Sequence, residues 1–196
     1  MNCGRLEDVY GRIRAHYGSD ELVMGEGKPD ASMMLIGEAP GKDEVKNRRP
    51  FCGKAGRNLD EFLRATSLKR EEIYISNVCK FRPTKTGSKG TVSNRTPVKG
   101  EIVEALPFLF EEIGAVSPKV IVTLGNIPLR ACKNDFSANI GDYHGEMTTT
   151  EINGISYNHF ALYHPASIIY NRQLKDVYLE DMGKLANYVQ MLTDRR

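Results

Sequence analysis

The chain has 196 residues, of which 40% are hydrophobic and 27% are charged, and its formal net charge at pH 7 is +2. This composition is ordinary for a soluble globular protein, and it predicts a single domain over residues 1–196. Apolar runs all fall well short of about 18 residues and the first residues lack an apolar signal core, so we expect a cytoplasmic protein that has no membrane span. We also expect a monomer. The small net charge alone does not identify a nucleic-acid-binding protein.

Hydrophobic spacing predicts strands that alternate with helices. Apolar residues three to four apart predict helices over residues 1–18, 56–65, 98–113 and 171–192, with a short helix after Asn126 that ends near Lys133. Short apolar runs predict buried strands over residues 31–36, 73–75, 120–124 and 160–163, and the Asn153-Gly154 turn predicts a hairpin over residues 146–160. The long polar segment 84–96 is predicted to be a loop, and loops of this length are usually functional or disordered. The alternation indicates an α/β fold with a mostly parallel sheet of four strands.

The four cysteines are far apart in the sequence and form no Cys-x-x-Cys pair. Metal ligation usually uses such close pairs. We therefore expect reduced or buried thiols at Cys3, Cys52, Cys79 and Cys132, and no metal site.

Polar side chains follow the predicted strands at the points where the strands end. Glu38, Asn77, Asn126 and His164 each come one to three residues after an apolar strand. Because parallel strands end at the same edge of a sheet, where such folds bind ligands, we expect these residues to share one crevice.

The groups in this crevice suit a nucleobase. An asparagine offers one acceptor and two donors to the edge of a base, and an aromatic ring such as Phe51 stacks on a base. A carboxylate from Glu38, Asp43 or Glu44 orients water, and a histidine donates a hydrogen bond to a leaving group that gains charge. Together they predict a site in which an extruded base is read and cut from its sugar.

Each group also has a simpler interpretation when it is taken alone. Asn77 is a residue that forms turns, His164-Pro165 is a common surface turn, and Phe51 fits a hydrophobic core. Glu44 lies among lysines and fits a solvated charge cluster. Only their joint placement at one sheet edge favours a site.

Three sequence blocks occur in an order that resembles the uracil-DNA glycosylases, specifically the family 4 enzymes of bacteria and archaea. Each block follows a predicted strand. They are residues 37–56 (GEAPG through Glu44 to PFCGKAG), residues 76–83 with 94–97 (SNVCKFRP and NRTP), and residues 164–167 (HPAS).

The resemblance implies a three-layer α/β/α sandwich with a central, mostly parallel four-stranded sheet. It also implies a DNA repair enzyme that flips uracil, or another deaminated base, out of single- or double-stranded DNA. The enzyme would hydrolyse the N-glycosidic bond and leave an abasic site, and this chemistry needs no metal. The sequence leaves open whether uracil, hypoxanthine or xanthine is preferred.

The resemblance also implies the residues of the site. Phe51 would stack on the base, Asn77 would bind its N3–H/O4 edge and reject cytosine, and His164 would stabilise charge at O2. Glu44 would position the attacking water, which makes Glu44, Asn77 and His164 the catalytic group. The base pocket would consist of Glu38, Ala39, Phe51 and Asn77, and the DNA contacts of Gly53, Lys54, Lys80, Arg82, Ser167 and Arg172.

One feature of the family is missing from this sequence. Family 4 enzymes carry four cysteines that hold a [4Fe–4S] cluster, and the first pair is replaced here near His16 and Tyr17. The third and fourth positions correspond to Phe81 and Ala105. Since the cluster needs thiolate sulfurs, we expect no cofactor, with Phe81 and Ala105 filling the space.

Two other functions are compatible with the sequence. A non-catalytic DNA-binding module on the same fold is one, since loss of the cluster can accompany loss of activity. An unrelated nucleotide-handling enzyme is the other, but Gly53-Lys54-Ala55 lacks the Ser or Thr of a P-loop and no GxGxxG motif occurs. The basic residues between Lys80 and Lys99 are either DNA contacts or a solvated loop.

Overall fold

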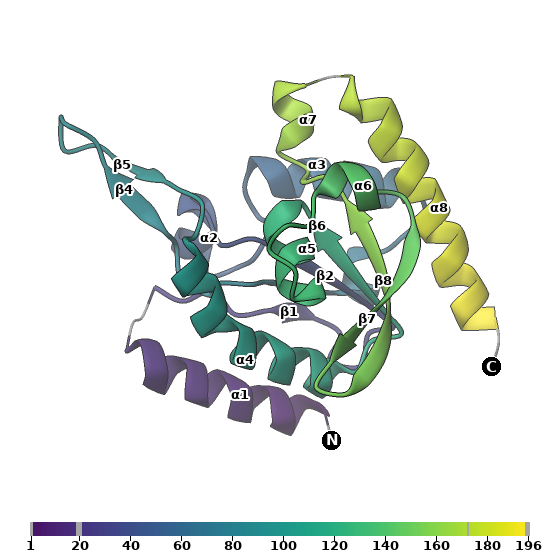
Figure 1. Cartoon of the computed structure of the whole chain (residues 1–196), viewed down its shortest axis with the longest axis horizontal. Helices are drawn as coiled ribbons and strands as arrows, with labels where there is room; N and C mark the ends of the chain where they lie inside the picture. The colour runs from purple at the N-terminus through teal and green to yellow at the C-terminus, as the bar shows by residue number, and fades with distance from the viewer. Residues whose placement is uncertain (1, 19–20, 172, 195–196) are drawn as a thin grey trace.

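The computed structural model describes residues 2–18, 21–171 and 173–194, and it contains a six-stranded sheet between two layers of helices (Figure 1). The strand order is β1-β3-β2-β6-β8-β7. The four central strands are parallel to one another, and the two edge strands are antiparallel to their neighbours. The strands are β1 (Glu26–Gly27), β2 (Met33–Gly37), β3 (Tyr74–Asn77), β6 (Val120–Leu124), β7 (Met147–Ile152) and β8 (Ile155–Leu162).

The predicted α/β fold is confirmed, and the four predicted buried strands form its parallel centre. The sheet is wider than the four strands expected because β1, which lies between the predicted helix 1–18 and the predicted strand 31–36, and β7 extend it at the two edges. The predicted hairpin is β7–β8, with Asn153 and Gly154 both at positive φ, as a type I′ turn requires. Its second strand continues into the parallel sheet, which places His164 at the same edge as the other strand ends.

Both faces of the sheet are covered, which explains why its strands are apolar throughout rather than alternating. Met34 and Ile36 of β2 pack in the core beneath α1, α4 and α5, whereas Met33 and Leu35 pack beneath α3 and α8. The covering helices are α1 (Asn2–Tyr17), α4 (Lys99–Val116) and α5 (Asn126–Lys133) on one face, and α3 (Lys54–Ala65) and α8 (Leu174–Asp194) on the other.

Short helices that the sequence analysis did not predict complete the loops. They are α2 (Lys42–Asn47), α6 (Ile140–Tyr143), α7 (Ser167–Tyr170) and a 3-10 turn at Arg70–Glu72. Among the described helices, none is both long enough and apolar enough to cross a bilayer.

The segment predicted as a long loop is instead a hairpin that stands away from the body of the molecule (Figure 1). Its strands are β4 (Thr84–Thr86) and β5 (Val92–Asn94), and every residue in them is exposed. We call residues 84–94 the arm.

Candidate functional site: a pocket at the carboxyl ends of the strands

The first side of the site is built by the ends of β2 and β3. Gly37 lies opposite Asn77 in the parallel register. Two backbone hydrogen bonds continue this pairing past the strands: Val78 N–H donates to the Gly37 carbonyl (2.9 Å) and Cys79 N–H to the Glu38 carbonyl (3.1 Å). Glu38 and Asn77, far apart in sequence, therefore lie next to each other.

The second side of the site is built by the ends of β6 and β8. The Gly125 N–H donates to the Leu162 carbonyl (2.8 Å), and Gly125 has φ +91, a conformation that favours glycine. A Cβ atom at Gly125 would lie 3.2 Å from the Cβ of His164. The His164 ring in turn lies 5.9 Å from the Phe51 ring, measured between centroids. The strand ends thus converge as the sequence analysis expected.

A pocket of about 660 Å³ opens between these groups and the root of the arm. Glu38, Ala39, Glu44, Phe51 and His164, all predicted site residues, line it. Lys85, Asn94 and Thr96, from the arm and the residues after it, line its other side. A smaller pocket of about 320 Å³ adjoins it and shares Glu38 and His164.

Asn77 lies deeper than the pocket wall. Its side chain is only 2% exposed, and its Nδ2 has no hydrogen-bond partner among the described residues. A Cβ atom at Gly37 would meet both the Asn77 Oδ1 (2.4 Å) and the tip of the Phe51 ring (2.5 Å), so Gly37 permits all three to pack together. An unpaired buried amide donor is costly, by about 1–3 kcal/mol, and such a group in a native protein needs an explanation, of which a catalytic role is one.

Glu44 anchors the loop that carries Phe51. Its Oε1 accepts from the Phe51 N–H (2.6 Å) and its Oε2 accepts from the Gly41 N–H (2.5 Å). Phe51 has φ +49, which a residue other than glycine adopts at a cost, and the Glu44 bond offsets part of that cost. Gly56 lets the Phe51 carbonyl approach helix α3, since a Cβ there would lie 1.8 Å from that oxygen.

His164 is a neutral hydrogen-bond donor. The Ala166 N–H donates to the His164 Nδ1 (3.1 Å), which leaves the proton of the neutral ring on Nε2. Burial lowers the pKa of His164 to about 4, because the charged imidazolium would lose its hydration. At neutral pH the ring therefore offers an uncharged N–H.

The Glu38 carboxyl is also affected by its surroundings in the pocket. Burial raises the pKa of its carboxyl, and a hydrogen bond with Thr96 works in the opposite direction. The side chain is half-buried and faces both pockets.

The prediction that Lys80 contacts DNA is wrong. Lys80 is 2% exposed, and its Nζ donates to the Ser76 Oγ (2.6 Å), the Asn77 carbonyl (2.7 Å) and the Glu112 Oε2 (2.6 Å). Tyr74 also donates to the fully buried Glu112 (3.2 Å). Lys80 thus ties the backbone of Asn77 to helix α4 from inside the protein.

Glu112 is a structural residue of the site that the sequence analysis missed, although a signal for it was present. It occupies a position of the predicted helix 98–113 beside Leu109 and Ile113, where apolar spacing expects another hydrophobic residue. A carboxylate on the apolar face of a helix indicates a buried partner of opposite charge. The sequence alone does not say that this partner is Lys80.

The other predicted DNA contacts that the structure describes are at or near the surface. Gly53 caps helix α3 without a side-chain hydrogen bond, and Lys54 is exposed beside it. The Arg82 Nε donates to the Asn94 Oδ1 (2.6 Å) at the root of the arm. Ser167 lines the smaller pocket. Arg172 lies outside the described residues, so these DNA contacts stay predictions.

Aromatic rings occupy the region where the resemblance implies a cluster. The Tyr17 ring lies 5.3 Å from Phe81 and 6.0 Å from Phe108, and the His16 ring lies 5.1 Å from Phe108. The nearby Cys79 is buried, which raises the pKa of its thiol to about 12.

Comparison with known proteins identifies relatives of this chain. Residues 24–183 match the family model of the uracil DNA glycosylase superfamily. The type-4 uracil-DNA glycosylase of Archaeoglobus fulgidus is 34% identical over 92% of this chain and 91% of the relative. Proteins of the same name from Sulfurisphaera tokodaii and Thermotoga maritima are 35% and 33% identical, over 83% and 89% of this chain and 72% and 86% of the relatives.

Proposed function

Because the chain belongs to the uracil DNA glycosylase superfamily, we propose that it releases uracil from DNA by hydrolysing the N-glycosidic bond. In this reaction the bond between the sugar C1′ and uracil N1 breaks, and its electron pair leaves with the base. A water oxygen bonds to C1′, and that water loses one proton to a general base. The uracil anion is protonated after release. The DNA keeps an abasic site.

The observation that carries this proposal is the unpaired amide of Asn77. The Nδ2 would donate to O4 of uracil, and the Oδ1 would accept from N3–H. Cytosine presents an amino group and an unprotonated N3 at the same positions, which leaves donor against donor and acceptor against acceptor. A buried site built for one pattern rejects the other strongly, because its own polar groups would be left unpaired.

A base reaches this amide only after a small movement, since Asn77 Nδ2 has almost no accessible surface. The tip of the Phe51 ring and the Asn77 Oδ1 both lie beside Gly37, so the ring is a neighbour of the amide. In our proposal the ring shifts off Gly37 when the base enters, and its face then stacks on the base.

His164 and Glu44 act on opposite ends of the breaking bond. The neutral Nε2–H of His164 donates to O2, where the departing uracil accumulates negative charge. Glu44 holds its two oxygens toward the backbone of Gly41 and Phe51, and the remaining lone pairs would accept from the attacking water. A negative carboxylate nearby also favours positive charge developing on the sugar.

We also propose that the protein works without an iron–sulfur cluster. Cluster ligation requires thiolates, whereas ring contacts among Tyr17, Phe81 and Phe108 take up this region, and His16 is bound to Glu104 (2.7 Å). Across the described residues no group of three His, Cys, Asp or Glu side chains is arranged to hold a metal ion. Purified protein is expected to be colourless and to lack iron and acid-labile sulfide; stoichiometric amounts of both would contradict the proposal.

The test of function is base release from defined oligonucleotides. Uracil in single- and double-stranded DNA is incubated with the protein, and abasic sites are cleaved with alkali. Asn77→Ala and His164→Ala should each lower the rate by about 10²–10³-fold, the usual cost of removing one such donor. Asn158→Ala, which removes a half-buried amide near the start of β8, is the matched control and should keep the parent rate. Parent rates in the first two variants would refute these roles.

The alternative, a DNA-binding module without catalysis, predicts a different result in the same experiment. The parent protein would then bind DNA but release no base. Hypoxanthine and xanthine oligonucleotides belong in the series, because base release from those alone would retain the reaction and change the substrate.

A further inference from the structure

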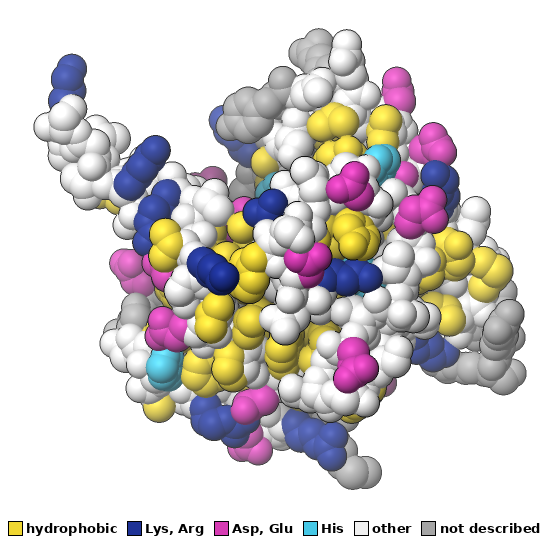
Figure 2. Space-filling model, viewed as in Figure 1, with side chains coloured by type: hydrophobic (Ala, Val, Ile, Leu, Met, Phe, Trp, Pro, Cys, Tyr) yellow, Lys and Arg dark blue, Asp and Glu magenta, His cyan; other side chains and the backbone are white. Residues whose placement is uncertain are grey.

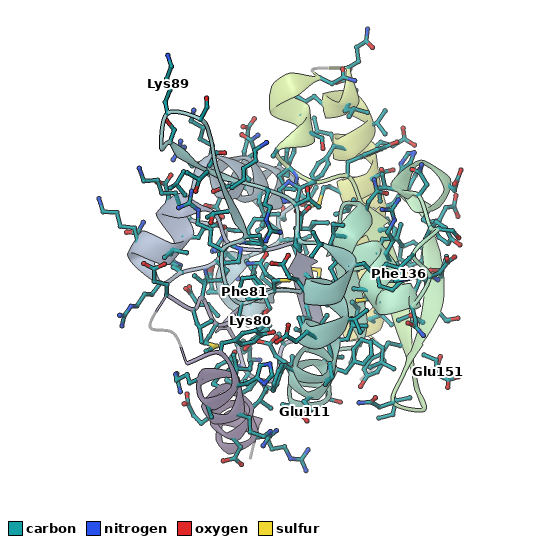
Figure 3. All side chains as sticks on the ribbon, turned by 60° about the vertical axis from the view of Figure 1, so that its left-hand side comes forward. Lys80, Phe81, Lys89, Glu111, Phe136 and Glu151 are labelled. Atoms are coloured by element: carbon teal, nitrogen blue, oxygen red, sulfur yellow. The ribbon has the colours of Figure 1, made fainter. Side chains whose placement is uncertain are left out.

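The arm carries positive charge and no negative charge. Between residues 81 and 100 the sequence contains Arg82, Lys85, Lys89, Arg95 and Lys99 and no Asp or Glu. In Figure 2 the projecting arm accordingly shows side chains in the colour of lysine and arginine and none in the colour of Asp and Glu. Lys89 lies at its far end, well away from the buried Lys80 (Figure 3).

The root of the arm is fixed to the body. Both terminal nitrogens of Arg95 donate to the Glu101 carboxylate (2.6 Å each), and its Nε donates to the Thr84 carbonyl (3.0 Å). Glu101 also accepts from the Val98 N–H (2.8 Å) at the start of α4. The direction in which the arm leaves the protein is therefore determined by helix α4.

The shaft of the arm is ordered but has no core. Three residue pairs join β4 and β5, and the Gly87 N–H donates to the Thr91 carbonyl (2.9 Å) at the turn. Its strand residues are exposed on both faces, and isolated two-stranded hairpins are marginally stable in water. A projecting ribbon with this composition gains most from a partner that lies along it.

The arm begins at the base pocket. Lys85 and Asn94 line the pocket together with Glu38 and His164. From Lys85 the arm continues through Thr86 into the turn that carries Lys89 at its far end (Figure 3). DNA that delivers a base to the pocket would have its flanking phosphates near this arm.

We propose that the arm is a contact for duplex DNA, with Lys85 and Lys89 against phosphates beside the extruded nucleotide. This inference rests on the proposed function for the position of the DNA. Cations and hydroxyl groups without carboxylates suit a polyanion, whereas protein partners usually need buried aromatic or aliphatic anchors. Val92 is the only large hydrophobic side chain in this described segment. The contact is with the backbone and carries no sequence preference.

The test measures binding to undamaged duplex DNA over a range of salt concentrations. Lys85→Gln/Lys89→Gln should weaken binding roughly tenfold near 0.1 M salt and reduce the slope of log K against log salt by about 1.8, two contacts at about 0.9 each. Lys69→Gln/Lys184→Gln removes two exposed lysines away from the pocket and should keep the parent slope. Lys85→Arg/Lys89→Arg should also keep it.

Two further measurements distinguish the outcomes. Uracil release from a short single strand that reaches little beyond the pocket should be unchanged in Lys89→Gln, because Lys89 lies at the far end of the arm. A parent slope and affinity in the Lys85→Gln/Lys89→Gln variant, or an equal loss of affinity for single strands and duplex, would overturn the duplex contact. Because binding is measured on undamaged DNA, failure of the proposed function appears separately, as a parent protein that binds but releases no uracil.

Discussion

Lys80 and Lys85 lie five residues apart in one basic segment, yet they belong to opposite kinds of environment. Lys80 is 2% exposed and paired with the buried Glu112, and it supports the backbone of Asn77. Lys85 is exposed on the arm. A lysine after a strand can therefore support a site from the protein core, as Lys80 does, or remain at the surface where a ligand can contact it, as Lys85 does.

The difference follows from the cost of burying charge. An ammonium inside a protein is tolerated only when its hydrogens are all bonded and a counter-charge is close, and Lys80 meets both conditions through Ser76, Asn77 and Glu112. On the arm, water solvates the charge of each lysine, and in our proposal DNA phosphates replace part of that water on binding. We therefore expect mutations at the two places to affect different properties: stability at the first and salt-dependent affinity at the second.

The largest effect is expected for Lys80→Met. It leaves Glu112 buried without its counter-charge, which should cost about 3–5 kcal/mol in the free energy of unfolding. Chemical denaturation measures this loss. Lys85→Met, the matched change on the arm, should stay within about 0.5 kcal/mol of the parent. Equal losses in the free energy of unfolding for the two variants would mean that burial does not explain the difference between the two lysines.

A smaller loss is expected for Gly56→Ala. The added Cβ would lie 1.8 Å from the Phe51 carbonyl, so the loop that carries Phe51 must shift, at a cost of about 1–3 kcal/mol. Uracil release should fall together with stability, because the same shift moves Phe51 in the pocket. Gly87→Ala on the arm places its Cβ 3.6 Å from the Thr91 carbonyl, an ordinary contact, and should leave both unchanged.

Acid should destabilise the body of the protein but should not change the charge of the arm. Burial lowers the pKa of His159 to about 3 and of His164 to about 4, so the unfolded chain binds more protons than the folded one below the ordinary pKa of 6.5. Stability should be fully present above about pH 7 and fall as the pH drops, by about 1 kcal/mol per histidine by pH 5.5.

The pH dependence can be divided by mutation. His159→Gln should remove about half of it. Because His164 is already neutral, uracil release under saturating substrate should show no loss from its protonation between about pH 7 and 5.5. A steep loss centred near pH 6.5 would show that His164 has an ordinary pKa.

The smallest effect concerns the root of the arm. Glu101→Gln removes the counter-charge of Arg95, so the arm should lose order while the core does not. Amide hydrogen exchange over residues 84–94 should become a few-fold faster, with exchange in β2 and β6 unchanged. Uniform acceleration throughout the protein would indicate instead that Glu101 supports the whole fold.

The sequence by itself determined the parallel centre of the sheet and the edge where the site lies. Apolar runs such as Met33 to Ile36 have few stable alternatives to a strand buried on both faces, and parallel strands must end at one edge. That rule placed Glu38, Asn77 and His164 together, and the family motifs gave Phe51 and Glu44.

Only the tertiary structure decided which charged residues lie inside and how the connecting loops fold. The Lys80–Glu112 pair joins residues 32 positions apart, and no local pattern specifies such a partner. The strands of the arm are exposed on both faces, so they lack the alternation that predicts a strand. Both have the same physical reason. The pattern of hydrophobic residues in one segment indicates which of its side chains are buried, whereas contacts between distant segments depend on the tertiary fold of the whole chain.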